Sequence, residues 1–209
     1  MGRPYTAAYA VRMGHREDLL EGAKRCLLAK GFVRTTARDI VTESGTNLAS
    51  IGYHYGSKDK LLAQAYISLV EAVGDQWGAD LFAGRGEAPV RSLERFHEVW
   101  GRIVRSFPEA RPIWLLSFES VLYGDRMPEA REILVDAQQQ GRAGLVPMFT
   151  GVVEDELDED IVNSEGRLYQ TLLNGLMLQW LLDPDEATDA DQLTAGLRRV
   201  IEGATGSAG

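Results

Sequence analysis

The chain has 209 residues, 44% of them hydrophobic and 25% charged, which is an ordinary composition for one or two globular domains. No apolar stretch is long enough to span a bilayer, and the first residues lack the apolar run of a signal peptide. The single cysteine, Cys26, excludes an intrachain disulfide and fits a core position, so we expect a cytoplasmic protein.

Charge is distributed unevenly along the chain. The formal net charge is −9, yet residues 1–60 hold ten Lys and Arg against six Asp and Glu, a local charge of +4. Phosphate contacts need local positive charge rather than a basic whole chain, so the N-terminal part suits nucleic acid. Ordinary scatter of charges also produces such asymmetry, and it does not decide the function alone.

The first two helices are marked by strong local signals. Apolar residues at helical spacing predict a helix over about residues 16–30, and Gly31 follows where a left-handed C-terminal cap is expected. Thr36 and Asp39 have the spacing of a capping box, which predicts the start of a short helix over about 37–44.

A third short helix follows a glycine. Gly45 ends the second helix, Asn47 is a good cap for a helix over about 48–54, and Ser57 caps a longer fourth helix. Two short helices joined by a tight glycine turn are typical of a helix-turn-helix, in which the second helix enters the major groove of DNA.

The remaining sequence also has helical periodicity, and no alternating pattern predicts a strand, so the expected fold class is all-α. Prolines at or near starts and breaks delimit five longer helices, expected at 88–106, 109–123, 128–154, 161–183 and 186–203. Pro147 lies inside one of these patterns and predicts a kink or an early end near Val146.

The expected recognition helix has a composition that suits groove reading. Ile51 and Tyr55, four residues apart, can anchor it inward and leave small or polar side chains outside. Asn and Ser can hydrogen-bond base edges, and Leu48 or Ala49 can touch a thymine methyl group. Lys58 falls in the first turn of the next helix, where free N–H groups also favour anions.

Several short motifs between residues 16 and 62 occur together in one register. They combine glycines, helix caps, core anchors and a Tyr-His-Tyr-Gly-Ser-Lys run, and they lie at 31–40, 43–47, 51–58 and 61–62. This segment resembles the signature of the tetracycline-repressor (TetR) family. The rest of the chain resembles that family only in length and helical texture.

The resemblance implies a domain organisation and a partner. An N-terminal arm and a three-helix DNA-binding domain are expected over residues 1–56, and a larger helical ligand-binding and dimerisation domain over 57–209. Double-stranded operator DNA is the implied partner, bound by a homodimer whose two DNA-binding domains shift out of register when a small molecule binds.

The resemblance also implies DNA-contacting residues. Thr36, Tyr53, His54 and Lys58 match phosphate-contacting positions, and Asn47, Leu48 and Ser50 match positions that often contact bases. Gly52 stands where many family members carry a tyrosine. The full set of candidate DNA contacts is Thr36, Arg38, Thr46, Asn47, Leu48, Ala49, Ser50, Gly52, Tyr53, His54 and Lys58.

Large apolar side chains are frequent between residues 96 and 183, and most of them must form core. Helical regulators also place ligands in mostly apolar cavities between helices. The candidate ligand-binding residues are Trp100, Trp114, Phe118, Met148, Tyr169, Asn174 and Met177, with further polar groups from Arg102, Glu119, Gln138 and Gln170.

The segment 169–182 is apolar on more than one face, which predicts burial on several sides. We expect it to face both its own core and a partner subunit, so that the last two helices, about 161–203, form a homodimer interface. An intrachain core for this segment is the alternative.

These features favour a ligand-responsive DNA-binding regulator, a repressor released from a palindromic operator by a small apolar or amphipathic molecule. An enzyme is disfavoured. The three histidines lack the spacing of metal ligands, and the sequence contains no phosphate-binding glycine loop and no nucleophile elbow. No metal or cofactor is expected. A small-molecule-binding protein without DNA binding is a second alternative, and activation rather than repression stays open.

Overall fold

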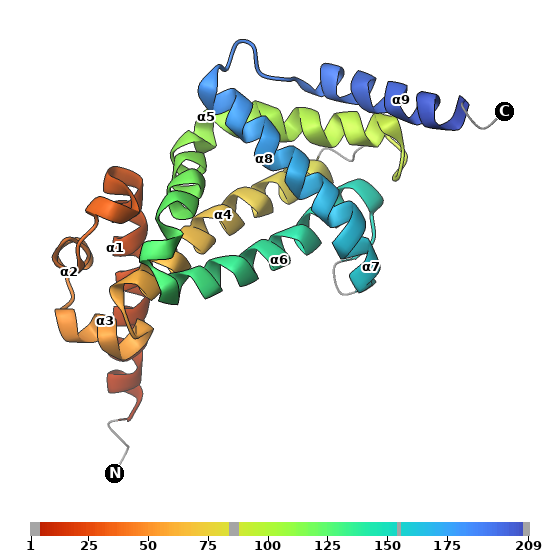
Figure 1. Ribbon diagram of the computed structural model, residues 1–209. Helices are drawn as coiled ribbons and strands as arrows, with labels where there is room; N and C mark the ends of the chain where they lie inside the picture. Colours follow the sequence, from red (N-terminus) through yellow and green to blue (C-terminus); the bar gives the residue numbers. More distant parts are fainter. Residues whose placement is uncertain (1–4, 84–87, 154–155, 207–209) are drawn as a thin grey trace. The chain divides into compact units, whose positions relative to one another are not determined.

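Every regular element of the computed structural model is a helix (Figure 1). The structure describes residues 5–83, 88–153 and 156–206, and these contain no strand. The expected all-α class is therefore confirmed. None of the described helices is both long and apolar enough to cross a membrane.

The chain forms two compact units, each of which combines segments that are separate in the sequence. The first unit comprises residues up to Glu71 together with Pro112–Ala137, and the second comprises Ala72–Arg111 together with the residues from Gln138 onward. Three helices contribute residues to both units: α4 (Lys58–Ala83), α5 (Leu93–Tyr123) and α6 (Pro128–Thr150).

The first unit is built on three N-terminal helices: α1 (Tyr5–Arg34), α2 (Ala37–Ser44) and α3 (Leu48–Tyr55). Helix α1 begins about ten residues before the expected start, because the alanine-rich stretch ahead of residue 16 has high helix propensity without an amphipathic pattern. Gly31 interrupts it with φ 75° and ψ 179°. The φ is positive, as the predicted left-handed cap requires, but the ψ is not that of the left-handed helical conformation.

The core of the first unit draws on sequence-distant helices. Side chains of α1 to α4 that are at most 7% exposed form its centre, among them Leu19, Leu27, Phe32, Ile40, Ile51, Tyr55, Leu61 and Leu62. Leu116 of α5, and Met127 and Ala130 around the start of α6, belong to the same cluster. The three N-terminal helices therefore share one core with parts of α5 and α6, and burial of this apolar surface stabilises all of them together.

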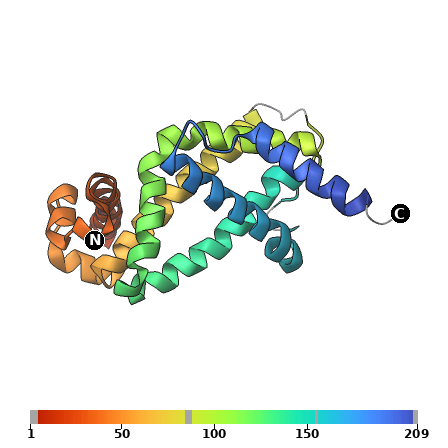
Figure 2. The same ribbon diagram turned by 45° about the horizontal axis from the view of Figure 1, so that its top comes forward.

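The second unit contains the C-terminal elements: α7 (Glu159–Ile161), a π-helical turn η3 (Val162–Gly166), α8 (Arg167–Leu182) and α9 (Ala190–Gly206). Both views show α9 lying along the N-terminal half of α5 (Figures 1 and 2). Aromatic rings form the centre of the unit, where Trp100 lies 5.5 Å from Phe149 and 6.0 Å from Phe96, measured between ring centroids.

Several helix boundaries in this part differ from expectation. The two helices predicted at 88–106 and 109–123 are one helix, α5, which continues through Pro108. Proline removes a backbone donor, but the flanking Phe107 and Ala110 are buried, and their packing outweighs the lost hydrogen bond. Pro147 likewise lies inside α6, which ends only at Thr150, before Gly151 with φ 70°.

The last helix begins later than predicted, at Ala190 rather than near residue 186. Asp189 and Gln192 form a capping box that the sequence analysis overlooked: the Gln192 N–H donates to Asp189 Oδ1 at 2.8 Å, and the Asp189 N–H donates to Gln192 Oε1 at 3.1 Å. These bonds satisfy N–H groups that would otherwise be unpaired at the helix start.

Candidate nucleic-acid interface

The turn between α2 and α3 has the geometry of a helix-turn-helix. Gly45 adopts φ 67° and ψ 21°, the left-handed conformation that glycine reaches without steric cost, and its N–H donates to the Val41 carbonyl. Asn47 then caps α3, because its Oδ1 accepts from the Ser50 N–H at 3.1 Å. The predicted turn and cap are both confirmed.

A capping box fixes the start of α2. The Asp39 N–H donates to Thr36 Oγ1 at 3.2 Å, and the Thr36 N–H donates to Asp39 Oδ2 at 2.9 Å. Lys30 of α1 reaches the same carboxylate, with Nζ 2.6 Å from Oδ1. The hydrogen bond from Lys30, followed by those from Thr36, holds the pKa of Asp39 well below its usual range. The ion pair between Lys30 and Asp39 thus links the capping box of α2 to α1.

Two side chains anchor α3 inward, as the spacing predicted. Ile51 is 4% exposed and Tyr55 is 7% exposed. The Tyr55 hydroxyl donates to the Arg16 carbonyl at 2.7 Å, and the Arg16 guanidinium lies 5.6 Å from the centre of the ring. Burial raises the pKa of Tyr55 above its ordinary value, so the hydroxyl stays protonated and keeps this bond at neutral pH.

The opposite face of α3 is open to solvent. Asn47, Ala49 and Gly52 are exposed, and Leu48 and Tyr53 expose 52% and 59% of their surfaces. A Cβ added at Gly52 would meet no atom within 4 Å, so this glycine leaves an open patch on that face.

Four of the predicted contact residues, Lys58 among them, lie partly or fully inward. Ser50 is only 9% exposed and sits on the buried side of α3. Thr46 is half-buried, with its hydroxyl 2.7 Å from that of Ser44. His54 is half-buried, and its ring lies edge-on to that of Tyr53 at 4.8 Å.

Cationic side chains flank the exposed face. Arg38 of α2 is exposed. Lys58 is the first residue of α4 and half-buried; its Nζ lies 3.1 Å from Asp59 Oδ1 and 3.4 Å from the Thr35 carbonyl oxygen. Ser57 caps the same helix end by accepting from the Lys60 N–H at 3.2 Å, as its position in the sequence predicted.

The sequence of this region matches a family model. Residues 19–65 match the model of the bacterial regulatory proteins of the tetR family. This segment is therefore similar to the tetR family of bacterial regulatory proteins. The chain is 31% identical over 108 residues to the transcriptional repressor AcnR of Corynebacterium efficiens, a match that covers 47% of this chain and 55% of AcnR. The match thus spans about half the length of that relative.

Solved structures with the same fold extend over nearly the whole chain. The multidrug-binding protein EbrR, determined in complex with proflavin, has a TM-score of 0.62 at 20% identity and covers 88% of this chain and 98% of its own. A chain from Streptomyces coelicolor A3(2), described as a transcriptional regulator, has a TM-score of 0.65 at 20% identity, with 89% and 97% covered. At this identity the likeness shows the fold. The family model that matches residues 19–65 describes bacterial regulatory proteins.

The candidate ligand residues are distributed over the two units. Trp114 and Phe118 belong to the first unit, whereas Trp100, Met148, Tyr169, Asn174 and Met177 belong to the second. Within the second unit Trp100 and Met177 are buried core, and Asn174 is exposed. Tyr169 lines a cavity of the second unit.

That cavity lies in the second unit and has a volume of about 290 Å³. Its wall combines aromatic, aliphatic and charged side chains: Arg91, Ser92, Leu93, Phe96, Phe149, Glu165, Tyr169, Leu197 and Ile201. The rings of Tyr169 and Phe149 are stacked at 3.9 Å, and Arg91 pairs with Glu165 at 3.0 Å. Burial, followed by the charge of Glu165, raises the pKa of Tyr169 to about 12, so its hydroxyl is neutral.

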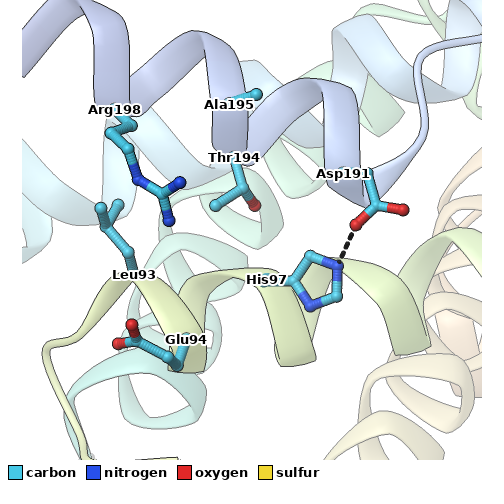
Figure 3. A pocket seen from close by; sticks show the side chains of 7 residues that line it. All are labelled: Leu93, Glu94, His97, Asp191, Thr194, Ala195 and Arg198. Carbon is cyan, nitrogen blue, oxygen red and sulfur yellow. Dashed lines mark hydrogen bonds and ion pairs between the residues drawn. The ribbon is translucent and has the colours of Figure 1, made fainter.

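A neighbouring hollow of about 270 Å³ lies between α5 and α9 (Figure 3). His97 of α5 meets Asp191 of α9 there, with Nε2 2.8 Å from Oδ1, and Arg198 and Glu94 lie further along the same hollow. The sequence analysis identified neither hollow, because each is formed by residues about 50 to 100 positions apart. The described residues include no group of His, Cys, Asp or Glu side chains arranged to hold a metal ion.

The additional polar candidates are engaged in other contacts. Gln170 accepts from Arg142 Nε at 2.8 Å and donates to the Gln138 carbonyl at 3.0 Å. Arg102 pairs with Glu98 at 2.9 Å. Glu119 hydrogen-bonds the backbone of Phe32 and Val33 within the first unit.

Proposed function

We propose that this chain is a DNA-binding transcriptional repressor that acts as a homodimer and leaves a palindromic operator when a small apolar or amphipathic molecule binds. The observation that carries the proposal is the exposed face of α3, an eight-residue helix anchored by Ile51 and Tyr55. A rod of this size with small and polar outer residues fits the major groove.

Base contacts are proposed for the exposed residues of this face. Asn47 can hydrogen-bond a base edge, and Leu48 and Ala49 can contact a thymine methyl group. Gly52 allows close approach of the backbone, since nothing occupies the space beside it. Ser50 is left out of this set because it faces inward.

Phosphate contacts are proposed for residues around α3. Tyr53 is exposed on α3, and Thr36 and Arg38 flank the start of α2. Lys58 lies in the first turn of α4, where the N–H groups of a helix start add to its charge. To bind a phosphate, its Nζ exchanges the contact with Asp59 for one with DNA.

Dimerisation is proposed through α8 and α9. Large apolar side chains on these two helices are exposed in the single chain: Leu168, Leu178, Leu182, Val200 and Ile201. Exposed apolar patches of this kind mark association surfaces, and two-fold pairing of the same two helices would cover them. Light scattering should give the mass of a dimer, and a monomer at micromolar concentration would contradict this part.

The effector is proposed to bind in the second unit, where Phe96, Phe149 and Tyr169 line a cavity close to the lower size limit of small-molecule sites. EbrR, which shares the fold, was crystallised with proflavin, an example of a small aromatic ligand. We propose that effector binding releases DNA because the matched family consists of bacterial regulatory proteins. We propose repression rather than activation because the relative AcnR is a repressor.

Selection of duplexes from a random library tests the DNA-binding part. The wild-type chain should enrich a palindromic sequence and bind it with an affinity that falls steeply with salt. Lys58→Ala should reduce the slope of log K against log salt by about one unit per chain. Arg131→Ala, which removes an exposed charge on α6, is the matched control and should leave the slope unchanged.

Enrichment of no sequence by the wild-type chain would contradict DNA recognition altogether. An unchanged slope in Lys58→Ala would remove Lys58 from the phosphate contacts and leave the α3 face to be tested by its own variants.

A further inference from the structure

A carboxylate of α5 binds the backbone of the DNA-binding region at the point where α1 is interrupted. Glu119 accepts two hydrogen bonds, from the Phe32 N–H to Oε2 at 3.1 Å and from the Val33 N–H to Oε1 at 3.2 Å. Gly31, with its positive φ, turns these two N–H groups toward the same anion. Hydrogen bonds to an ionised acceptor are stronger than neutral ones.

A side chain at Gly31 would displace the Glu119 carboxylate. A Cβ placed on Gly31 would lie 2.9 Å from Glu119 Oε1 and closer still to Oε2. Phe32 is 1% exposed and packs edge-on against Tyr66 of α4, with ring centroids 5.7 Å apart. The Tyr66 hydroxyl in turn bonds Ser117 of α5 at 2.8 Å. Glu119 therefore acts within a packed contact between α1, α4 and α5.

The bonded amides lie just before the helix-turn-helix. Only residues 34–36 separate Val33 from Ala37, the first residue of α2, and Thr36 already holds the capping box. The connecting segment is thus fixed at one end by Glu119 and at the other by Asp39. If either end shifts, the backbone of residues 34–36 must change conformation or α2 must rotate.

We propose that Glu119 is a positioning residue that sets the orientation of α2 and α3 relative to the C-terminal part of α5 and thereby the affinity for specific DNA. The proposal rests on the proposed function for its DNA readout. Since α5 also carries Phe96 and His97, which line the two hollows of the second unit, Glu119 stands on the helix that joins those hollows to the DNA-binding region.

Three variants separate the hydrogen bonds from simple packing. Glu119→Ala removes both acceptors, and Glu119→Gln keeps one acceptor oxygen at nearly the same size. Glu132→Ala removes an exposed carboxylate from α6 in the same unit and serves as the matched control.

Backbone hydrogen exchange tests the positioning role without any DNA. Glu119→Ala should accelerate exchange of the amides of residues 32–44 at least tenfold, Glu119→Gln should have a smaller effect, and Glu132→Ala should have none. Exchange that is unchanged in Glu119→Ala, or equally fast in the control, would overturn the proposal. If Glu119→Ala does not fold, faster exchange confined to this segment in Glu119→Gln supports the proposal, and unchanged exchange overturns it.

DNA binding provides the second measurement, with the duplex that the wild-type chain selects from a random library as the probe. Glu119→Ala should weaken binding to that duplex about tenfold or more, while binding to a scrambled duplex of equal length stays within twofold. Equal loss on both duplexes, or no loss on either, would overturn the role in specific binding. If the wild-type chain selects no duplex, the proposed function fails, whereas hydrogen exchange still decides the positioning of α2.

Discussion

The two compact units are organised by different kinds of contact. In the first unit, caps such as Thr36 with Asp39 and Asn47 with Ser50 join residues three apart, and glycines with positive φ lie between the helices. In the second unit the defining contacts join distant residues, such as Phe96 with Phe149 and His97 with Asp191. The turn and caps of the helix-turn-helix are thus specified by local signals, whereas the hollows of the second unit depend on the packing of helices far apart in sequence.

The largest expected effect concerns the core on which the local signals depend. Phe32→Ala should lower the free energy of unfolding by about 3–5 kcal/mol, because it removes a fully buried ring that packs against Tyr66. Val33→Ala, at an adjacent side chain that is 54% exposed, should change it by less than about 0.5 kcal/mol. Chemical denaturation measures both, and similar effects for the two variants would contradict the assigned core.

A smaller effect is expected from the capping box of α2. Thr36→Ala should cost about 1 kcal/mol, because the Asp39 N–H loses its acceptor. Thr171→Ala, at an exposed hydroxyl inside α8, is the control and should be near neutral, since alanine favours helix interiors. Thermal unfolding measures the stability of both variants. A change as small for Thr36→Ala as for Thr171→Ala would show that the capping box contributes little to stability.

A pair of tryptophans tests the long-range packing of the second unit. Trp77 Nε1 donates to Ser106 Oγ at 2.7 Å, whereas Trp100 Nε1 is buried without an acceptor among the described residues. Trp77→Phe should therefore cost about 1 kcal/mol more than Trp100→Phe, in which no hydrogen bond is lost. A larger loss for Trp100→Phe in chemical denaturation would reveal a partner for its N–H.

The acid dependence of stability gives the smallest expected effect. The pKa of Asp39 is lower in the folded chain than in the unfolded chain, so its stabilising contribution is present above the unfolded value, about 4, and is lost as the pH falls toward the folded value. The difference in unfolding free energy between wild type and Asp39→Asn should be constant above about pH 5 and shrink below about pH 4. A difference that persists undiminished at pH 3 would exclude the ionised carboxylate as its source.

The contrast between the units also explains what the sequence could predict. The glycine turn at Gly45, the caps at Thr36 and Asn47 and the inward anchors Ile51 and Tyr55 follow from spacings of three or four residues, and the structure confirms them. The inward position of Ser50 was missed, although it neighbours the anchor Ile51 on the helix surface.

Long-range features could not be predicted in the same way. The cavity wall needs Phe149 of α6 to meet Tyr169 of α8, and no pattern in one segment reports on the other. Glu119 was expected to supply a polar group to a ligand cavity. Its actual partners, two backbone N–H groups more than 80 residues away, carry no side-chain signal in the sequence.

Methylation interference on the selected duplex tests the central claim most directly, because methyl groups at guanine N7 project into the major groove that α3 is proposed to enter. We predict two symmetric clusters of interfering guanines, one on each half of the site, with centres at least about 10 base pairs apart. Interference confined to a single cluster, or binding that tolerates every major-groove methyl group, would contradict groove reading by α3 of a two-fold dimer.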